Sequence, residues 1–195
     1  MDIEAYAAQV PQYYSLDVPP TLERHLKERN PGNILDCGCG DGSLLYALKK
    51  RDLLLDKKVF AIDLSKNRVN LVRRIDEKFI VSVDSAEDIS TVEDRSIDFL
   101  TSTQVIEHVD DKKMIAAIGR VVRSGGRVYL STVFKKWYGW YFYRNNGKWV
   151  LDPTHIREYR SDQELLGLID PNEFRIVENK KALFWFPVAD LFIKW

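Results

Sequence analysis

Apolar residues recur along the chain in two alternating patterns: short continuous runs, and longer stretches with a period near 3.6 residues. The short runs predict strands at 33–37, 58–63, 79–83, 97–101 and 127–133. The longer stretches predict helices at 22–29, 43–51 and 67–77, and a further helix that Asp110 caps and Gly125-Gly126 terminates. Strands that alternate with helices indicate βαβ units, so the sequence predicts an α/β fold with a mostly parallel central sheet and helices on both faces.

The predicted helices each place apolar residues on one face. The inward positions are Leu44, Leu45 and Leu48, then Leu71, Val72 and Ile75, and then Met114, Ile115, Ile118, Val121 and Val122. After Phe134 the rhythm changes: Asn145-Asn146-Gly147 predicts a hairpin turn, followed by a helix at 161–169 and a strand at 173–182.

Length and composition favour one globular domain over residues 1–195, with 45% hydrophobic and 30% charged residues. We expect residues 1–32 to form an N-terminal helical cap and residues 134–160 an inserted aromatic and basic cap over a substrate. The net charge of +0 gives no strong signal for nucleic acid.

Neither end of the chain carries a recognisable membrane or export signal. Met1–Val10 lacks the basic and apolar regions of a signal peptide, and no run reaches the ~20 apolar residues of a spanning helix. The only two cysteines are Cys37 and Cys39, whose strand-like spacing points them to opposite faces and makes a mutual disulfide geometrically poor. We therefore expect a cytoplasmic protein with reduced cysteines and no metal site.

The clearest chemical motif is the glycine loop Asp36-Cys37-Gly38-Cys39-Gly40-Asp41-Gly42, which joins the first strand to the following helix. Glycines at alternate positions let a ligand approach bare backbone, and the helix N-terminus adds amide donors. Dinucleotides and S-adenosylmethionine are the two ligand classes that use this device.

Spacing and charge separate these two ligands. Dinucleotide folds require a third glycine at position 43, where this chain has serine. The carboxylates of Asp36 and Asp41 would repel a diphosphate at a cost of about a kcal/mol or more each, but they suit the ammonium and sulfonium of S-adenosylmethionine. A nicotinamide oxidoreductase is therefore disfavoured.

Two later strand ends carry further candidates for the cofactor. Asp63 ends the second strand, where a carboxylate can accept hydrogen bonds from both ribose hydroxyls; capping of the next helix is the alternative. The third strand runs into Asp84-Ser85-Ala86-Glu87, which could bind the adenine amino group or form an ordinary polar loop.

The chain resembles the type 11 group of class I S-adenosylmethionine-dependent methyltransferases, which have a Rossmann-like three-layer sandwich fold. The resemblance covers residues 30–133, roughly half of the chain, through five ordered segments: 34–42, 61–65, 85–88, 104–109 and 123–128.

The resemblance implies that the loop from Asp36 through Gly38, Cys39 and Gly40 to Gly42 holds the methionine part of the cofactor. It also implies that Asp63 binds ribose and that the adenine lies near a second group of residues, Leu64, Ser85 and Ala86. The type 11 methyltransferases favour Asp at the position where this chain has Ser85, and in this chain Asp84 lies one residue earlier. Either Asp84 or Ser85 could therefore meet the adenine amino group. Gln104 would lie against the methionine portion, and Glu107-His108 is typical of the group and often structural.

The acceptor is expected to bind near the aromatic and basic segment Phe134–Trp149, which contains no acidic residue. Such a surface suits a small molecule or lipid-like acceptor that is anionic or apolar, and a core hairpin or a homodimer interface is the alternative. His155, in the stretch Asp152-Pro153-Thr154-His155, is the candidate general base, and an ordering role for this histidine is the alternative. Two other functions remain open: methylation of RNA or protein, and a nonenzymatic partner subunit that keeps the fold.

Overall fold

The computed structural model describes residues 4, 14–137, 143–145, 147–181, 185–188 and 191–194. It divides into two compact units, each described by itself below. The sheet unit comprises Met1–Val133 and Thr154–Arg157, and the second unit comprises Phe134–Pro153 and Glu158–Trp195. The expectation of a single domain with two caps stays a prediction, and residues 1–3 and 5–13 of the N-terminal cap lie outside the described part.

The sheet unit contains five parallel strands in the order β3-β2-β1-β4-β5. Their bounds are β1 Asn33–Cys37, β2 Lys58–Asp63, β3 Ile80–Val83, β4 Ile97–Thr103 and β5 Val122–Ser131. The helices are α2 Pro20–Arg29, α3 Ser43–Lys50, α4 Lys66–Ile75, η1 Ile106–His108 and α5 Asp111–Val121. This arrangement confirms the α/β, Rossmann-like prediction, and the early strands and helices agree with it to within two residues at most ends.

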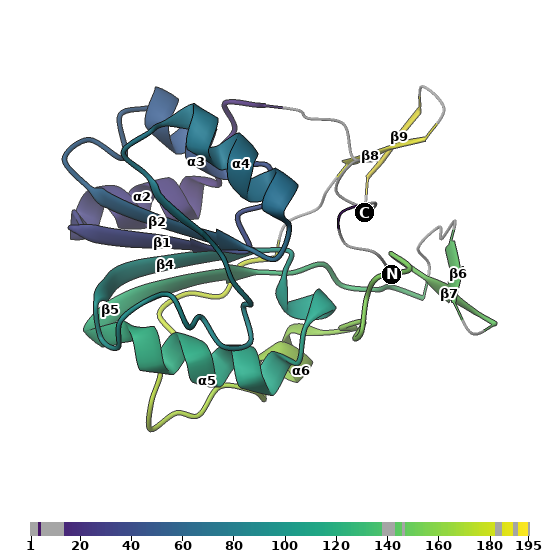
Figure 1. The fold of residues 1–195 in the computed structure, drawn as a ribbon. Helices are drawn as coiled ribbons and strands as arrows, with labels where there is room; N and C mark the ends of the chain where they lie inside the picture. The colour runs from purple at the N-terminus through teal and green to yellow at the C-terminus, as the bar shows by residue number, and fades with distance from the viewer. Residues whose placement is uncertain are drawn as a thin grey trace. The chain divides into compact units, whose positions relative to one another are not determined.

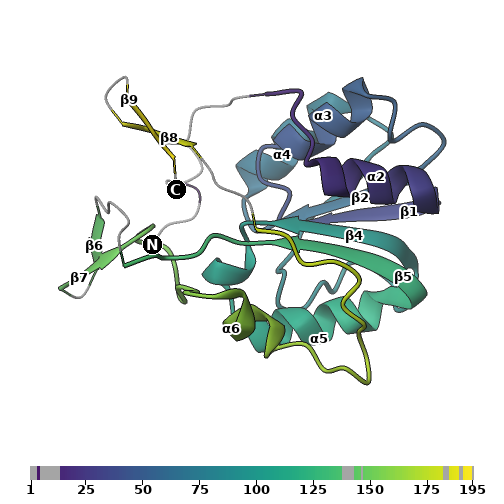
Figure 2. The same cartoon turned by 180° about the vertical axis from the view of Figure 1, so that it is seen from behind.

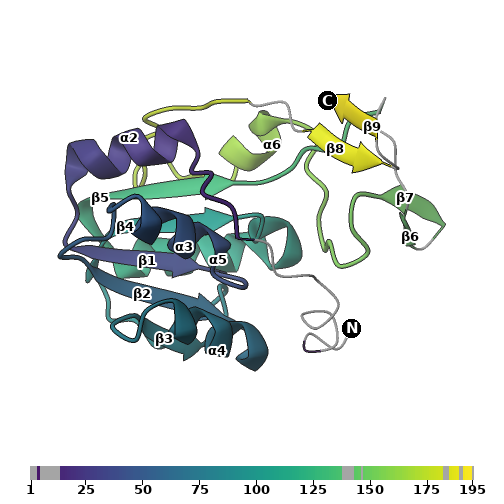
Figure 3. The same cartoon turned by 90° about the horizontal axis from the view of Figure 1, so that it is seen from above.

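Helices cover both faces of this sheet, which gives the predicted three layers. Figures 1 and 2 show α2, α3 and α4 on one face and α5 on the other. Figure 3, from above, shows α2, α3 and α4 side by side over the sheet. Leu22 and Leu26 of α2 are buried in the same core as Ile34 and Leu48, so this helix is part of the packed layer.

Two side-chain hydrogen bonds begin α4 and α5 where the sequence places helix starts. Ser65 accepts a hydrogen bond from the Arg68 amide, and Asp110, as predicted, accepts one from the Lys113 amide. The inward face of α4 is narrower than predicted: Val69 and Val72 are buried, whereas Leu71 and Ile75 are only half-buried. The physical reason is that Leu71 and Ile75 line a surface pocket between α3 and α4.

The predicted boundary at Gly125-Gly126 is wrong. The α5 helix ends at Val121, and β5 starts at Val122, so both glycines lie within the strand. The pairing with β4 jumps from Ile97↔Val122 to Phe99↔Arg127, which leaves the glycines in a bulge, with Gly125 at a φ of 74°. The two glycines therefore interrupt regular structure, as the sequence suggests, but they do so as a bulge inside β5, which starts earlier than the predicted residue 127.

The second unit contains α6 Asp162–Leu166 and two antiparallel pairs, β6 Tyr143–Asn145 with β7 Lys148–Val150 and β8 Trp185–Val188 with β9 Leu191–Lys194. Asn145 pairs with Lys148, which confirms the hairpin. The helix is shorter than the predicted 161–169. The predicted strand at 173–182 is wrong, because residues 175–181 have no regular structure and the strands come later. Half-buried and exposed positions do not alternate there as a strand requires.

No helix among the described residues is long and apolar enough to span a bilayer.

At two positions of the loop, Gly38 and Gly42, both the neighbouring side chains and the backbone conformation oppose any residue other than glycine. At Gly38, with φ 75°, an added Cβ would clash with a Val105 methyl group. At Gly42, with φ 87°, it would lie 2.5 Å from Ile75 Cδ1. At Gly40, with φ 55°, a Cβ would meet no atom within 4 Å, so only the left-handed conformation opposes a side chain there.

We predict that Gly42→Ala lowers the free energy of unfolding more than Gly40→Ala does. Both variants carry the penalty of a left-handed alanine, but only Gly42→Ala overpacks the contact with α4, which adds about 1–3 kcal/mol. Urea denaturation of the ligand-free variants measures the difference. Equal losses of stability would show that the contact between Gly42 and Ile75 relaxes without cost.

Candidate active site

The site lies where the parallel strands β1, β2 and β4 end at the same edge of the sheet. Asp36 of β1 is in register with Ala61 of β2 on one side and Thr101 of β4 on the other. In open parallel sheets this carboxyl edge is where ligands bind. The register therefore brings the predicted cofactor residues from three separate segments to one edge.

The glycine loop folds back over the end of β2. The amides of Gly38 and Cys39 both donate to the Ile62 carbonyl at 2.9 Å, and the Gly40 amide donates to Asp63 Oδ2 at 3.0 Å. Cys37 and Cys39 are buried free thiols in this structure, and burial raises the pKa of both. Neither thiol is available as a nucleophile in this state.

Asp36 is buried beneath the loop, with 2% of its surface exposed. Its Oδ1 accepts a hydrogen bond from the Thr101 hydroxyl at 2.8 Å. Burial raises the pKa of this carboxyl to about 7; the Thr101 hydrogen bond opposes the rise, and the charge of Asp63 adds to it. A cationic ligand group nearby would favour the ionised form, which suits the ammonium that the sequence assigns here.

Asp63 connects the glycine loop to α4. Its Oδ1 accepts a hydrogen bond from the Ser65 amide at 2.9 Å, Oδ2 accepts the Gly40 amide, and Arg68 lies 3.8 Å away. A carboxylate has about four acceptor positions, so these contacts leave capacity for ribose hydroxyls. The capping and ribose interpretations of Asp63 are therefore compatible, and the ribose role stays a prediction.

Asp41 has a local structural role. Its carboxylate accepts hydrogen bonds from the Ser43 amide and hydroxyl, at 3.1 and 2.7 Å, where α3 begins. Its carbonyl accepts the Tyr14 hydroxyl at 3.0 Å, which connects the segment before α2 to the loop. Burial, and then the charge of Asp41, raises the pKa of the Tyr14 phenol, so it remains a neutral donor.

The loop after β3 is organised by Asp84. Its carboxylate accepts hydrogen bonds from Ser85 and Ser90 on one oxygen and from the amide and hydroxyl of Thr91 on the other. Burial alone would raise the pKa of Asp84, but these hydrogen bonds outweigh it and lower the pKa. Since about four acceptor positions are filled, Asp84 orders the loop, and Ser85 and the buried Ala86 remain the predicted adenine contacts.

Leu64 and Gln104 lie at two other strand ends on this edge. Leu64 follows Asp63 and is 46% exposed, an unusual position for leucine and one that suits packing against a flat ring. Gln104 has a φ of 54°, a conformation that non-glycine residues adopt only at a cost, and its amide donates to the Ser131 carbonyl at 2.9 Å. Strained backbone of this kind concentrates at functional sites, but the cofactor contacts of both residues stay predictions.

His155 is held against the loop between β4 and α5, all within the sheet unit. The amides of Ile156 and Arg157 donate to the Glu107 carbonyl at 2.9 and 3.1 Å, and Arg157 forms an ion pair with Asp111. His108 Nδ1 lies 2.9 Å from the Thr154 hydroxyl.

The rings of His155 and His108 meet edge to face, with their centroids 4.7 Å apart. The chain after the aromatic segment thus brings His155 against His108, in the short helix η1 that follows β4.

Glu107 and His108, whose type of pair is often structural, form one cluster with the candidate base His155. One ligand atom from each lies within 4.8 Å of the others, and Glu107 is buried. Three such side chains could hold a divalent cation, so the expectation of no metal site stays a prediction. Thr101, the partner of Asp36, was also missed, because a threonine within an apolar strand gives no sequence signal of a polar contact.

A model of the methyltransferase domain matches residues 6–179. The chain belongs to this methyltransferase-domain family, whose members depend on S-adenosylmethionine. The finer assignment to the type 11 group stays a prediction.

Among curated relatives, the chain is 28% identical over 151 residues to a ubiquinone biosynthesis O-methyltransferase of Xanthomonas oryzae, covering 68% of this chain and 60% of that protein. It is 23% identical to the protein of the same name from Proteus mirabilis, covering 90% of this chain and 75% of that protein. The chain thus spans about three fifths of the length of the Xanthomonas relative.

Among solved structures, the fold is similar to that of the YcgJ protein of Bacillus subtilis, with a TM-score of 0.58, 20% identity and coverage of 76% of this chain and 65% of that one. It is also similar to the PH0226 protein of Pyrococcus horikoshii, with a TM-score of 0.51, 20% identity and coverage of 64% and 63%. At this identity the likeness shows the fold alone.

We predict that Asp36→Asn gains stability relative to the wild-type ligand-free protein as the pH rises from 4 to 8. Because the folded pKa lies above the ordinary value of 3.8, the folded state binds more protons than the unfolded state between about pH 4 and 7. The free energy of unfolding therefore falls as the pH rises through this window, and the variant lacks that loss. We expect a gain of about 1–3 kcal/mol over this rise in pH, measured by urea denaturation across the pH range.

The control for this experiment is Asp52→Asn, which changes an exposed carboxyl in the turn after α3. A stability difference between wild type and Asp36→Asn that does not change with pH would contradict the raised pKa.

Proposed function

We propose that the protein transfers a methyl group from S-adenosylmethionine to a hydroxyl oxygen of a small-molecule acceptor. The observation that carries this proposal is the convergence of the glycine loop, Asp63 and His155 on one edge of the sheet. The loop and Asp63 belong to the cofactor side, and His155 belongs to the acceptor side.

The cofactor side fits S-adenosylmethionine by shape and by charge. The backbone at Gly40 borders open space, which gives the methionine part room to approach. A cationic group of the ligand would stabilise the ionised form of the buried Asp36 carboxyl, and Asp63 has capacity for ribose hydroxyls. When bound, S-adenosylmethionine supplies the methyl group.

The residues of this chain would then hold the acceptor and remove its proton. Positioning dominates such a transfer, because the reacting atoms must be held about 3 Å apart and aligned. A hydroxyl becomes a better nucleophile as it loses its proton, and an imidazole titrates near neutral pH. We assign to His155 the role of accepting the proton of the acceptor hydroxyl. The amides of the two residues after His155 donate hydrogen bonds to the Glu107 carbonyl.

The choice of a hydroxyl acceptor is supported by the relatives, which are named as O-methyltransferases. An apolar acceptor is supported by the aromatic segment 134–149, in which Trp137 is 93% exposed. Residues 138–142 and 146 of this segment lie outside the described part, and its role as an acceptor cap stays a prediction.

The cations of the aromatic segment are mostly engaged within the second unit, which weakens the case for RNA. Lys135 forms an ion pair with Glu158, Lys136 donates to the Arg160 carbonyl, and Arg144 lies over the Trp149 ring at 5.2 Å. We therefore favour a small molecule over a polyanion.

The test is release of S-adenosylhomocysteine from S-adenosylmethionine in the presence of candidate acceptors. We expect turnover with apolar phenols, no turnover with their O-methyl ethers and none with RNA. Turnover with RNA alone, together with salt-dependent RNA binding, would contradict the proposal. Failure to bind S-adenosylmethionine would favour a nonenzymatic partner subunit.

Asp63→Ala is predicted to weaken S-adenosylhomocysteine binding by more than tenfold, because it removes the ribose acceptor and the bond to the Gly40 amide. Isothermal titration measures the affinity, and Asp63→Asn, which keeps one acceptor oxygen, should lose less. Unchanged affinity in Asp63→Ala would remove this residue from the ribose site.

His155→Ala is predicted to lower turnover by about 100-fold while changing cofactor affinity less than twofold, since general bases contribute about 10²–10⁴-fold. The matched control is His25→Ala on α2, which should retain full turnover.

A chelator in the same assay separates proton removal by His155 from activation of the acceptor by a cation at Glu107, His108 and His155. We expect the chelator to have no effect on turnover. If the chelator abolished turnover and a divalent cation restored it, the role of His155 as base would be overturned.

A further inference from the structure

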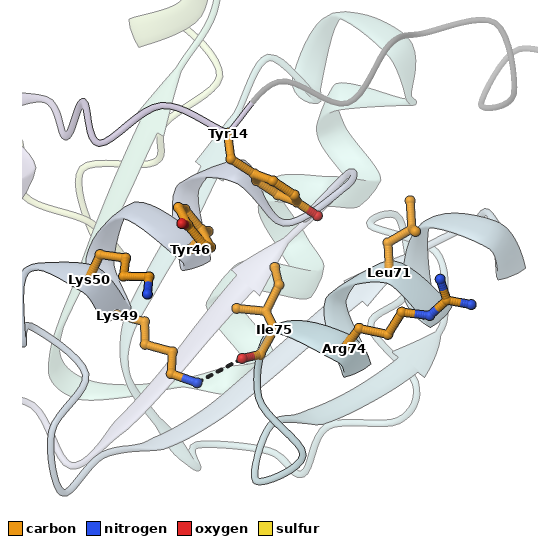
Figure 4. A pocket seen from close by; sticks show the side chains of 7 residues that line it. All are labelled: Tyr14, Tyr46, Lys49, Lys50, Leu71, Arg74 and Ile75. Carbon is orange, nitrogen blue, oxygen red and sulfur yellow. Dashed lines mark hydrogen bonds between the residues drawn. The ribbon is translucent and has the colours of Figure 1, made fainter.

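A pocket of about 310 Å³ opens between α3 and α4. Figure 4 shows Tyr46 and Lys50 on the α3 side, Leu71 and Arg74 on the α4 side, and Tyr14 above them. All of these residues belong to the sheet unit. The volume lies at the lower end of the range of small-molecule pockets, which is about 300–1,000 Å³.

The pocket is positively charged. Lys49, Lys50 and Arg74 line it, and none of its lining residues is acidic. Lys49 is engaged, because its ammonium donates to the Ile75 carbonyl at 2.7 Å and pairs with Asp76 at 3.0 Å. Within the described part of the chain, Lys50 and Arg74 have no carboxylate at ion-pair distance, so two cations on opposite sides are available to an anion.

The rest of the pocket is aromatic and apolar. The rings of Tyr14 and Tyr46 lie 4.8 Å apart, and the Lys50 ammonium lies 5.5 Å from the centre of the Tyr46 ring. Leu71 and Ile75 are the half-buried residues that the helical pattern predicts to face inward. A ligand here would place an apolar body against these side chains and its charge near Lys50 and Arg74.

We propose that this pocket binds a small organic phosphate, with the phosphate held by Arg74, the charge of Lys50 adding to the attraction, and an apolar or aromatic body against Leu71, Ile75 and Tyr46. Arg and Lys are the side chains that bind phosphate groups, and Arg adds bidentate hydrogen bonds. A free inorganic phosphate would leave the apolar part of the pocket unfilled, and a neutral aromatic molecule would leave the two cations without an anion.

The pocket also contacts the glycine loop at two points. Tyr14 donates to the Asp41 carbonyl, and Ile75 packs where a side chain at Gly42 would otherwise lie. A phosphate ligand that orders Tyr14 and Ile75 therefore also orders the glycine loop and so increases the affinity for the cofactor. By linkage, the bound cofactor increases the affinity for the phosphate ligand by the same factor. This coupling rests on the proposed function, which assigns the loop to the cofactor, whereas binding of the phosphate does not.

The first experiment is isothermal titration of the cofactor-free protein with phenyl phosphate. We expect measurable binding, at least fivefold weaker binding of inorganic phosphate and none of phenol. Arg74→Ala should weaken phenyl phosphate binding at least tenfold and Lys50→Ala at least threefold. The matched control is Lys112→Ala, which removes an exposed cation from α5 and should bind like wild type.

Several outcomes of this titration would overturn the site. These are absence of binding, equal affinity for inorganic phosphate, and unchanged affinity in a folded Arg74→Ala variant. Binding to phosphatidic acid vesicles without binding to phenyl phosphate would replace the soluble ligand by a lipid surface and likewise overturn it.

The second experiment measures S-adenosylhomocysteine affinity with and without saturating phenyl phosphate. We expect at least a threefold gain in wild type and no gain in Tyr14→Phe, which keeps the ring pair but removes the hydrogen bond to Asp41. An equal gain in the variant, or no gain in wild type, would refute the coupling. Failure of the protein to bind S-adenosylhomocysteine at all would overturn the proposed function and the coupling, while the first titration would still decide the phosphate site.

Discussion

The amide of Gly40 donates to the carboxylate of Asp63, and this one bond joins the loop after β1 to the end of β2, between residues 23 apart in sequence. It can form because β1 and β2 are parallel and in register, with Cys37 opposite Ile62. The same register lets the amides of Gly38 and Cys39 share the Ile62 carbonyl. The shape of the loop is therefore set by the sheet, and the loop cannot be displaced without loss of the β2 end that carries Asp63.

Charge is concentrated at this strand edge in a way that favours a cationic ligand. Asp36 is buried next to Asp63, and the repulsion between them adds to the cost of burying an ionised carboxylate. The folded chain carries this cost before any ligand binds. A cofactor with an ammonium and a sulfonium would recover part of it, which is a physical reason for Asp36 and Asp63 to lie beside a glycine loop of this kind.

The sequence predicted the sheet unit well because its signals are local. Each strand up to β4 is a short apolar run, and the helices start at Ser65 and Asp110, whose side chains cap them. The boundary at Gly125-Gly126 failed because a bulge and a helix end use the same residues, and only pairing with β4 distinguishes them. The strand predicted at 173–182 failed because its few apolar residues stand among charged ones, and most of the described positions there are exposed.

The sequence singles out the candidate site residues, whose contacts with a cofactor stay predictions, but it does not show how the chain holds them. The carboxylates of Asp84 and Asp41 accept hydrogen bonds from nearby residues, Thr91 and Ser43 among them, and so order their own loops. The return of His155 to Glu107 and His108 spans 47 residues from His108, and no local pattern encodes such a contact. The phosphate pocket depends likewise on packing, because Leu71 and Ile75 face a gap between helices where the periodicity predicted core.

The most direct measurement is a crystal structure of the protein with S-adenosylhomocysteine. The ribose hydroxyls should lie within hydrogen-bond distance of Asp63, with the homocysteine part along Gly38–Gly42 and the sulfur on the side of His155. A ligand bound elsewhere, or one in this cleft that leaves Asp63 more than 4 Å from the ribose, would contradict the assignment of this strand edge as the active site.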